Sequence, residues 1–127
     1  MARTRITSHS PWEPKFGYCR AIRVRDTIAV TGSTAVLPDG RIGGKGDAYA
    51  QARAALEVIR AAIEGLGASM SHVVRTRMYV TDMKFSDDVG RAHGEVFGDF
   101  PPATSMVQVV RLIHPDMLVE IEADAIL

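Results

Sequence analysis

Two adjacent prolines, Pro101 and Pro102, constrain the fold of this chain more than any other feature. Proline lacks an amide hydrogen and disfavours helix in the residue before it, so a preceding helix must end here. Residues 103–110 are rich in β-branched side chains, which predicts a strand. Alternation along this strand divides it into a set suited to the core, Ala103, Ser105, Val107 and Val109, and a set facing the other way, Thr104, Met106, Gln108 and Val110.

A second strand is predicted from Leu118 to Ile126, after the short loop 114–117. Its apolar residues alternate with three acidic ones, Glu120, Glu122 and Asp124. This alternation indicates a sheet with one apolar face and one acidic face. We expect these two consecutive strands to pair with each other.

The rest of the chain predicts four more strands and two helices. The strands are expected at 1–8 (an edge strand), 18–25, 27–31 and 72–81, and the helices at 48–65 and 85–97. Asp47 is a suitable N-cap for the first helix. Two prolines and a glycine predict no regular structure in 10–17, and the glycine-rich segment 37–46 lacks the spacing of a phosphate-binding loop.

Two amphipathic helices can cover only one face of a sheet of this size. On strand 72–81, Val74, Thr76, Met78 and Val80 are predicted to share one face, and Val73, Arg75, Arg77 and Tyr79 the other. The second of these faces, with the acidic residues and Ile126, is suited partly to water and partly to burial. We therefore expect a subunit interface to cover it.

Composition narrows the function classes for a chain of 127 residues, read as one domain, 1–127. Fifteen basic and fifteen acidic residues cancel, which argues against a nucleic-acid partner. A single cysteine, Cys19, excludes an internal disulfide, and no apolar segment resembles a signal peptide or membrane span. We expect a soluble cytoplasmic protein with no membrane partner. No motif indicates a metal or another cofactor, and no Ser-His-Asp arrangement is evident.

Several short motifs recur along the chain in a characteristic order. They are Gly17–Ala21, Val30–Gly32, Gly67–Ser69, Val73–Thr76, Tyr79–Met83, Pro102–Ser105 and Leu118–Ala123. In this order and spacing they resemble the RidA/YjgF family of reactive-intermediate deaminases, also described as endoribonuclease L-PSP. The resemblance implies a chorismate-mutase-like α+β fold with a six-stranded mixed sheet, two helices on one face, and a homotrimer. It also implies hydrolysis of the imines and enamines that pyridoxal-phosphate enzymes release, in clefts between subunits.

The chain departs from the family pattern at positions that would bind substrate. The resemblance implies an arginine after Pro-Ala that clamps the substrate carboxylate, and here that position is Thr104. The usual cleft asparagine of the second helix falls at Gly90. The common Ser-Gly-Gln motif is Thr31, Gly32 and Ser33. This pattern indicates a divergent subgroup that lacks the carboxylate-binding arginine.

Other cleft positions match the family. Tyr18 and Glu120 correspond to its tyrosine and to the glutamate that positions or activates water, and we predict them as catalytic. Arg20 is read either as a replacement cation or as a solvated strand residue. Trp12 either fills a gap in its loop or walls a ligand cleft. The remaining predicted binding residues are Glu13, His93, Ser105 and Met106, with Gly90 and Gly94 predicting either close backbone packing or a cavity beside the second helix.

Three functions follow from these observations. The first is hydrolysis of a small imine or enamine that differs from simple amino-acid-derived imino acids. The second is a ligand-binding or regulatory trimer without catalysis. Ribonuclease activity is least favoured, because the chain has no excess of positive charge and no paired catalytic histidines.

Overall fold

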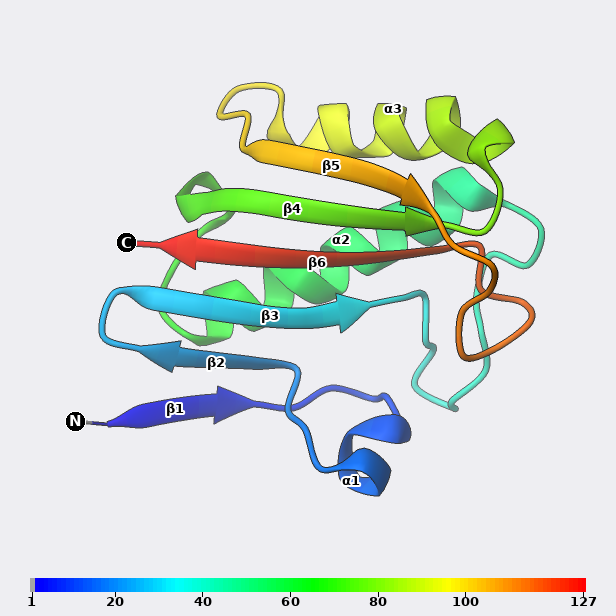
Figure 1. Ribbon diagram of the computed structural model, residues 1–127. Coiled ribbons are helices and arrows are strands. Elements are labelled where there is room, and N and C mark those ends of the chain that lie inside the picture. The colour runs from blue at the N-terminus through cyan, green and yellow to red at the C-terminus, as the bar shows by residue number, and fades with distance from the viewer. Residues whose placement is uncertain (1) are drawn as a thin grey trace.

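Six strands form one mixed sheet in the order β1-β2-β3-β6-β4-β5 in the computed structural model, which describes residues 2–127 (Figure 1). The strands are β1 (Arg3–Ile6), β2 (Ala21–Val24), β3 (Thr27–Ser33), β4 (Val73–Val80), β5 (Ala103–Gln108) and β6 (Val119–Ile126). All six predicted strands are therefore present. Five have narrower bounds than predicted, and β3 extends two residues further, to Ser33. Met1, which the prediction placed in the first strand, lies outside the described residues.

The predicted pairing of the last two strands is wrong. β6 lies between β3 and β4 and is antiparallel to both, whereas β5 is an edge strand parallel to β4. Two features explain this arrangement. The alternate residues Val119, Ile121 and Ala123 are fully buried, so β6 gains most from a central position. The helix between β4 and β5 is the crossover that parallel strands require.

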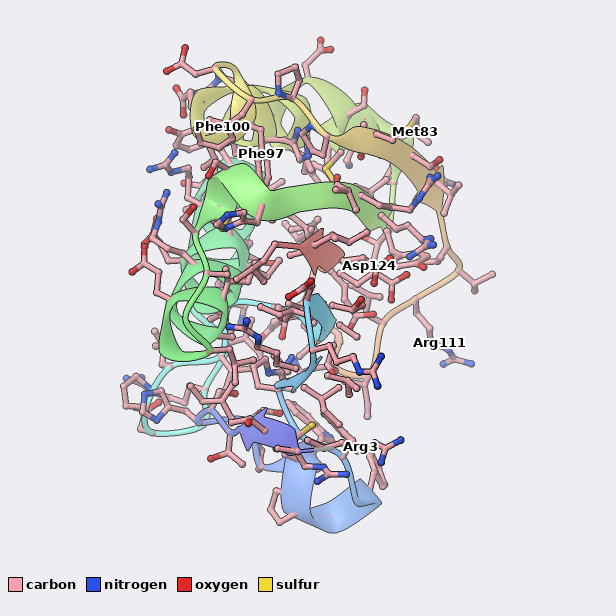
Figure 2. All side chains as sticks on the ribbon, turned by 90° about the vertical axis from the view of Figure 1, so that its left-hand side faces the viewer. Arg3, Met83, Phe97, Phe100, Arg111 and Asp124 are labelled. Atoms are coloured by element: carbon pink, nitrogen blue, oxygen red, sulfur yellow. The ribbon has the colours of Figure 1, made fainter. Side chains whose placement is uncertain are left out.

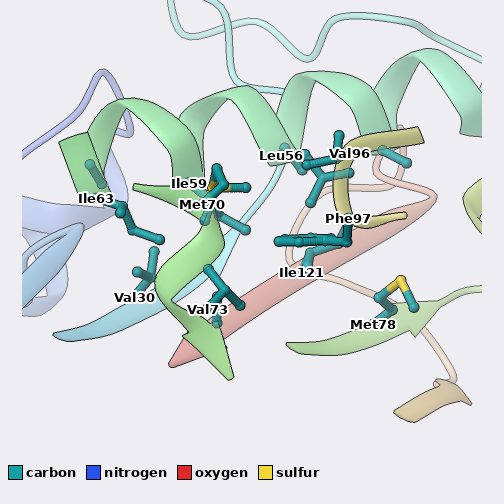
Figure 3. Close-up of a cluster of buried hydrophobic side chains, with 14 of the residues drawn as sticks. Val30, Leu56, Ile59, Ile63, Met70, Val73, Met78, Val96, Phe97 and Ile121 are labelled. Carbon is teal, nitrogen blue, oxygen red and sulfur yellow. The ribbon is translucent and has the colours of Figure 1, made fainter. Parts of the chain in front are cut away.

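Helices α2 (Ala48–Gly65) and α3 (Ser86–Phe97) cover one face of the sheet, as predicted. In Figure 2 the sheet is seen from its end, with α2 on one side and Asp124 on the other. Asp47 caps α2 by accepting a hydrogen bond from the amide of Ala50 at 3.0 Å. The core between the layers is mostly aliphatic and centres on Leu56, Ile59 and Ile121 (Figure 3).

A short helix, α1 (Trp12–Phe16), occupies the segment that was predicted to be irregular. The prediction failed because Pro11 is the N-cap and Pro14 lies in the first turn. The first four amides of a helix have no partner inside it, so proline is tolerated there. Gly17 ends the helix in the left-handed region at φ 76°. Two 3-10 turns complete the fold, η1 (Met70–His72) and η2 (Met83–Phe85).

Two predicted strand faces are also corrected. A register shift in β4 between Val73 and Arg75 turns Val73 into the core and leaves Val74 exposed, because a bulge reverses the alternation. In β5, Thr104 pairs in register with buried Thr76 and Met106 with buried Met78, so this set faces the helices. The set predicted for the core, including Ser105 and Val107, is exposed.

The sheet face opposite the helices carries the charged side chains that were predicted for it. Arg77 lies 3.5 Å from a carboxylate oxygen of Glu122 and 3.4 Å from one of Asp124. The Tyr79 hydroxyl donates to Glu122 at 2.6 Å. This face has no covering layer within residues 2–127. None of the helices in this range is both long and apolar enough to cross a membrane.

Candidate functional site

A cleft of about 130 Å³ opens where α1, the end of β3 and the start of β6 meet. Trp12 and Phe16 of α1 form one wall, with Tyr18 following that helix and Glu120 projecting from β6. Trp12 thus lines a cleft, and its predicted role as the wall of a ligand site stays a prediction. Two apolar residues of the loop before β6, Ile113 and Met117, line it from another side, and the polar residues Ser10 and Thr34 also contribute.

Glu120 lines this cleft and has a pKa shifted from its ordinary value. Burial raises its pKa, and the negative charge of Glu122 raises it further, while the positive charge of Arg20 acts in the opposite direction. The result is a carboxyl group with a raised pKa beside the phenol of Tyr18. Such a group can both hold and release a proton nearer to neutral pH than an exposed glutamate can.

Gly32 provides the space for this carboxyl group. It lies in a β-bulge, since the pairing of β3 with β6 shifts register between Val30 and Ser33. Glycine has no Cβ, so the backbone can approach Glu120 closely at this point. The neighbouring residues on either side are tied down by hydrogen bonds: Thr31 Oγ1 donates to the carbonyl of Cys19 at 2.8 Å, and buried Ser33 donates to the carbonyl of Thr31 at 2.8 Å.

Arg20 lies beneath the cleft in a buried ion pair with Glu13, and neither residue is solvated. Arg20 is 4% exposed and Glu13 is 2% exposed, and Nη2 of Arg20 lies 2.9 Å from Oε2 of Glu13. Nε donates to the same carboxylate at 3.1 Å, and Nη1 donates to the carbonyl of Gly32 at 2.7 Å. All three guanidinium nitrogens therefore donate to groups of the chain itself, and Arg20 links α1 to the bulge that supports Glu120.

Hydrogen bonds from Ser8, together with Arg20, hold Glu13 ionised despite its burial. Burial alone would raise the pKa of Glu13, but hydrogen bonds from Ser8 and the hydrogen bond and charge of Arg20 outweigh it, and the pKa is lowered. The Ser8 hydroxyl donates to one carboxylate oxygen, and its amide donates to the other at 3.0 Å. The solvated-strand alternative for Arg20 is thus contradicted, because its charge is matched and buried.

A second group of predicted residues lies at the other edge of the sheet, around β4, β5 and α3. Oγ1 of Thr76 lies 2.8 Å from Nε2 of buried His93 and donates to Oγ1 of Thr104 at 2.7 Å. Met106 packs partly against the core, and Ser105 is exposed on the opposite face of β5. Gly90 has open space around it, so within this chain it is not the site of close backbone packing.

The predicted site residues therefore form two separate groups in a single chain. Tyr18, Glu120, Gly32, Arg20 and Trp12 surround the cleft, whereas Thr104 points toward the helix side of the sheet and Glu120 toward the open side. The structure does not bring Thr104 or His93 into this cleft.

Sequence reasoning missed three residues that these groups depend on. Ser8 binds both partners of the buried ion pair, and Met117 lines the cleft from a loop. Thr76 links His93 to Thr104, and it was detectable in principle because it is a polar residue among the apolar side chains of its strand face. Across residues 2–127 no group of three or more His, Cys, Asp or Glu side chains is arranged to hold a metal ion.

Comparisons with known proteins agree with this architecture. A sequence model of the family described as Endoribonuclease L-PSP matches residues 7–127. An uncharacterised protein of Streptomyces coelicolor is 37% identical over 121 residues, covering 95% of this chain and 90% of its own. A RutC family protein of Pyrococcus abyssi is 34% identical over 125 residues, covering 98% of both chains.

Solved structures give the same assignment. The crystal structure of Rv2704 from Mycobacterium tuberculosis, described as a member of the YjgF/YER057c/UK114 family, is 44% identical and superposes with a TM-score of 0.90. It covers 99% of this chain and 100% of its own. The YjgF gene product of E. coli is 28% identical with a TM-score of 0.84, over 97% of this chain and 98% of its own. The chain therefore belongs to the YjgF/RutC family, the family described as Endoribonuclease L-PSP.

Proposed function

We propose that this chain is a divergent member of its family that hydrolyses a small imine or enamine metabolite in a cleft completed by a neighbouring subunit. One observation carries the proposal: Tyr18 and Glu120 line the same cleft, and burial raises the pKa of Glu120. A carboxyl group of this kind can exchange a proton with water near neutral pH, which is what hydrolysis of a C=N bond requires.

The proposed reaction consumes one water and releases ammonia. Glu120 takes a proton from water as the water oxygen bonds to the imine carbon. The carboxyl group then delivers that proton to the nitrogen, which gives a carbinolamine. In a second transfer, Glu120 takes the hydroxyl proton of the carbinolamine and passes it to the nitrogen as the C–N bond breaks, so that a carbonyl compound and ammonia result and the carboxylate is regenerated. The Tyr18 hydroxyl orients the attacking water or the nitrogen by a hydrogen bond. No cofactor is needed for this sequence of steps.

The assembly is proposed to be a homotrimer. Two features support a subunit interface over the open face of the sheet: no layer from residues 2–127 covers that face, and it includes exposed apolar residues such as Val107 and Ile126, at 45% and 52% exposure. The separation of Thr104 from Glu120 in one chain also favours a site that two subunits share. Native mass spectrometry tests the stoichiometry directly.

The proposed substrate differs from simple imino acids because Thr104 carries no charge. The Thr104 and Ser105 hydroxyls would offer hydrogen bonds, and Gly90 would leave space where the family pattern has a polar side chain. Arg20 is not assigned the role of replacement clamp, since its guanidinium is committed to Glu13, Gly32 and Ser33. Its proposed role is to hold the bulge under Glu120.

The first experiment measures ammonia release from 2-iminopropionate, formed in situ by an amino-acid oxidase. The native protein is compared with Thr104→Arg, and with Thr104→Gln as a matched long but uncharged control. Activity in Thr104→Arg alone would mean that the hydrolytic groups are intact and the specificity has changed. Activity in the native protein would contradict the altered specificity, and silence in every variant would count against this hydrolytic assignment.

Variants of the two proposed catalytic residues give a second test. Tyr18→Phe and Glu120→Gln should each lower turnover of the active protein by about 10²-fold or more, the usual contribution of general acid–base catalysis. If both variants turn over an identified substrate at the native rate, the assignment of these residues is wrong.

A ligand-binding or regulatory trimer without catalysis is the second candidate. The uncharged Thr104 and the missing side chain at Gly90 favour it, because both remove polar groups from the predicted cleft. Metabolites that raise the melting temperature but are never consumed would support this role. Ribonuclease activity stays least favoured, and RNA cleavage by a nuclease-free preparation would support it instead.

A further inference from the structure

A chain of three hydrogen-bonding side chains connects α3 to the edge of the sheet. It runs from Nε2 of His93 to Oγ1 of Thr76, 2.8 Å apart, and on to Oγ1 of Thr104, a further 2.7 Å. His93 and Thr76 are buried, whereas Thr104 is exposed on strand β5. This hydrogen-bonded series of side chains thus begins in the core and ends at the surface. None of its three groups takes part in the hydrolytic steps proposed above.

Proton counting fixes the direction of this chain. The Thr76 hydroxyl has one hydrogen, and it is donated to Thr104. Thr76 can therefore only accept from His93, so Nε2 of His93 must carry a proton. The hydroxyl hydrogen of Thr104 has no acceptor among the residues that the structure describes, 2–127. Thr104 consequently offers a donor to whatever lies beyond it.

The surroundings of His93 keep this arrangement uncharged. Burial lowers the pKa of His93, and the ring packs against that of Phe97 with centroids 4.6 Å apart. Gly90 and Gly94, within one turn of His93 on α3, have no neighbouring atoms within 4 Å of the position that a Cβ would take. Both glycines are exposed, so the open space at these positions faces away from the core, and the donor at the strand edge is part of an uncharged set of hydrogen bonds.

We propose that His93 and Thr76 are positioning residues that hold the Thr104 hydroxyl as a donor toward an uncharged carbonyl oxygen of the ligand, such as that of an amide or ester. This inference rests on the proposed function in one respect, that Thr104 belongs to the ligand site. A neutral hydroxyl can satisfy a carbonyl oxygen, but it cannot offset the cost of removing a carboxylate from water. The substrate class is therefore one in which the acid group of an imino acid is masked.

The first test examines the hydrogen bonds from His93 through Thr76 to Thr104 in the protein without any ligand. The ¹⁵N resonances of the His93 ring should show the proton on Nε2 in the native protein and in Thr76→Ser, which keeps the hydroxyl. Thr76→Val, which has the same shape but no hydroxyl, should shift the Nε2 resonance. A native ring protonated on Nδ1 alone, or identical spectra for Thr76→Ser and Thr76→Val, would overturn the proposal.

The second test uses two probes of similar size, pyruvamide and pyruvate, which differ in the charge of one group. Binding is followed by the amide resonance of Thr104. Pyruvamide should bind the native protein, Thr104→Ser and Thr76→Ser, and should bind about tenfold more weakly to Thr104→Val and Thr76→Val, which is the upper range for one hydrogen bond. Pyruvate should bind more weakly than pyruvamide to the native protein.

The set of variants separates loss of the Thr104 hydrogen bond from general destabilisation of the fold. Thr76→Val leaves a buried histidine donor without a partner and can destabilise the fold, whereas Thr104→Val alters only the exposed end of the chain. Thr27→Val, at an exposed position of β3, is the control for losing a strand hydroxyl and should bind pyruvamide like the native protein. Equal or preferred binding of pyruvate, or no binding of either probe, would overturn the assigned ligand class. Because neither test depends on turnover, failure to release ammonia from an imine would count against the hydrolase proposal alone.

Discussion

A Cβ atom on Gly32 would lie 2.7 Å from Cδ of Glu120 and 2.9 Å from its Oε2. Real Cβ atoms do not approach other atoms so closely. Any residue larger than glycine at position 32 would therefore clash with the Glu120 carboxyl group in its present position. The position of Glu120 in the cleft thus depends on the absence of a side chain one strand away. This dependence is tested by adding one carbon atom.

Gly32→Ala should displace the Glu120 carboxyl group, and because the crowded atoms are the far end of a flexible side chain the fold should lose no more than about 1 kcal/mol, the lower end of the usual cost of overpacking. Urea denaturation measures the stability, and binding or turnover of a cleft ligand should fall at the same time. An alanine variant with native stability and native ligand binding would contradict the close packing of Gly32 against Glu120.

Gly94→Ala is the matched addition of a methyl group, with the opposite expectation. Gly94 lies within α3, and a Cβ there would meet no atom within 4 Å. Because glycine costs a helix about 1 kcal/mol relative to alanine, the variant should be more stable by up to about that amount in urea denaturation. Destabilisation would mean that another subunit packs closely against this side of the helix.

The buried pair Glu13 and Arg20 should be far more costly to break than to replace. Arg20→Met alone leaves a buried carboxylate without its partner and should cost about 3–5 kcal/mol. The double variant Glu13→Gln/Arg20→Met should cost less than the sum of the two single variants, because neither charge remains. Arg41→Met, at an exposed ion pair with Asp39, is the control and should leave the urea midpoint almost unchanged. Additive losses would show that the pair is not coupled.

Local periodicity predicted the elements of this fold because each strand and helix must turn an apolar face to the core. Strand order is different, since it depends on how much each strand buries. The alternating residues of β6 predicted a half-buried strand, but no local sequence pattern indicated that this strand would lie between β3 and β4. The helix α1 was missed because its prolines fall where an N-terminal turn has no need of amide donors.

The candidate site was predictable only for residues that a sequence motif identifies directly, without reference to a partner elsewhere in the fold. Tyr18 and Glu120 were found from motifs and lie together in the cleft. The burial of Arg20 and its ion pair were not predictable from the sequence. Its partner Glu13 lies on the other side of a loop, and only the folded chain shows that the two charges pair. Likewise, the partner of Thr104 is Thr76 on the neighbouring strand, and their contact follows from a parallel register that the sequence pattern does not specify.

The raised pKa of Glu120 predicts how stability depends on pH. Burial, the largest cause, raises this pKa above 4.5 in the folded state, so between 4.5 and the folded pKa the native chain holds more protons at this site than the unfolded chain does. The contribution of Glu120 to stability therefore falls as pH rises through that window. Glu120→Gln keeps the shape and removes the charge, so its stability relative to the native protein should increase with pH across the window.

Other groups, such as Glu13 and His93, contribute equally to both proteins and cancel in this difference. Urea denaturation of both proteins at a series of pH values measures it, with Glu64→Gln on α2 as the control for removing a carboxylate. A difference that is flat or decreases with pH would contradict the burial of the Glu120 charge.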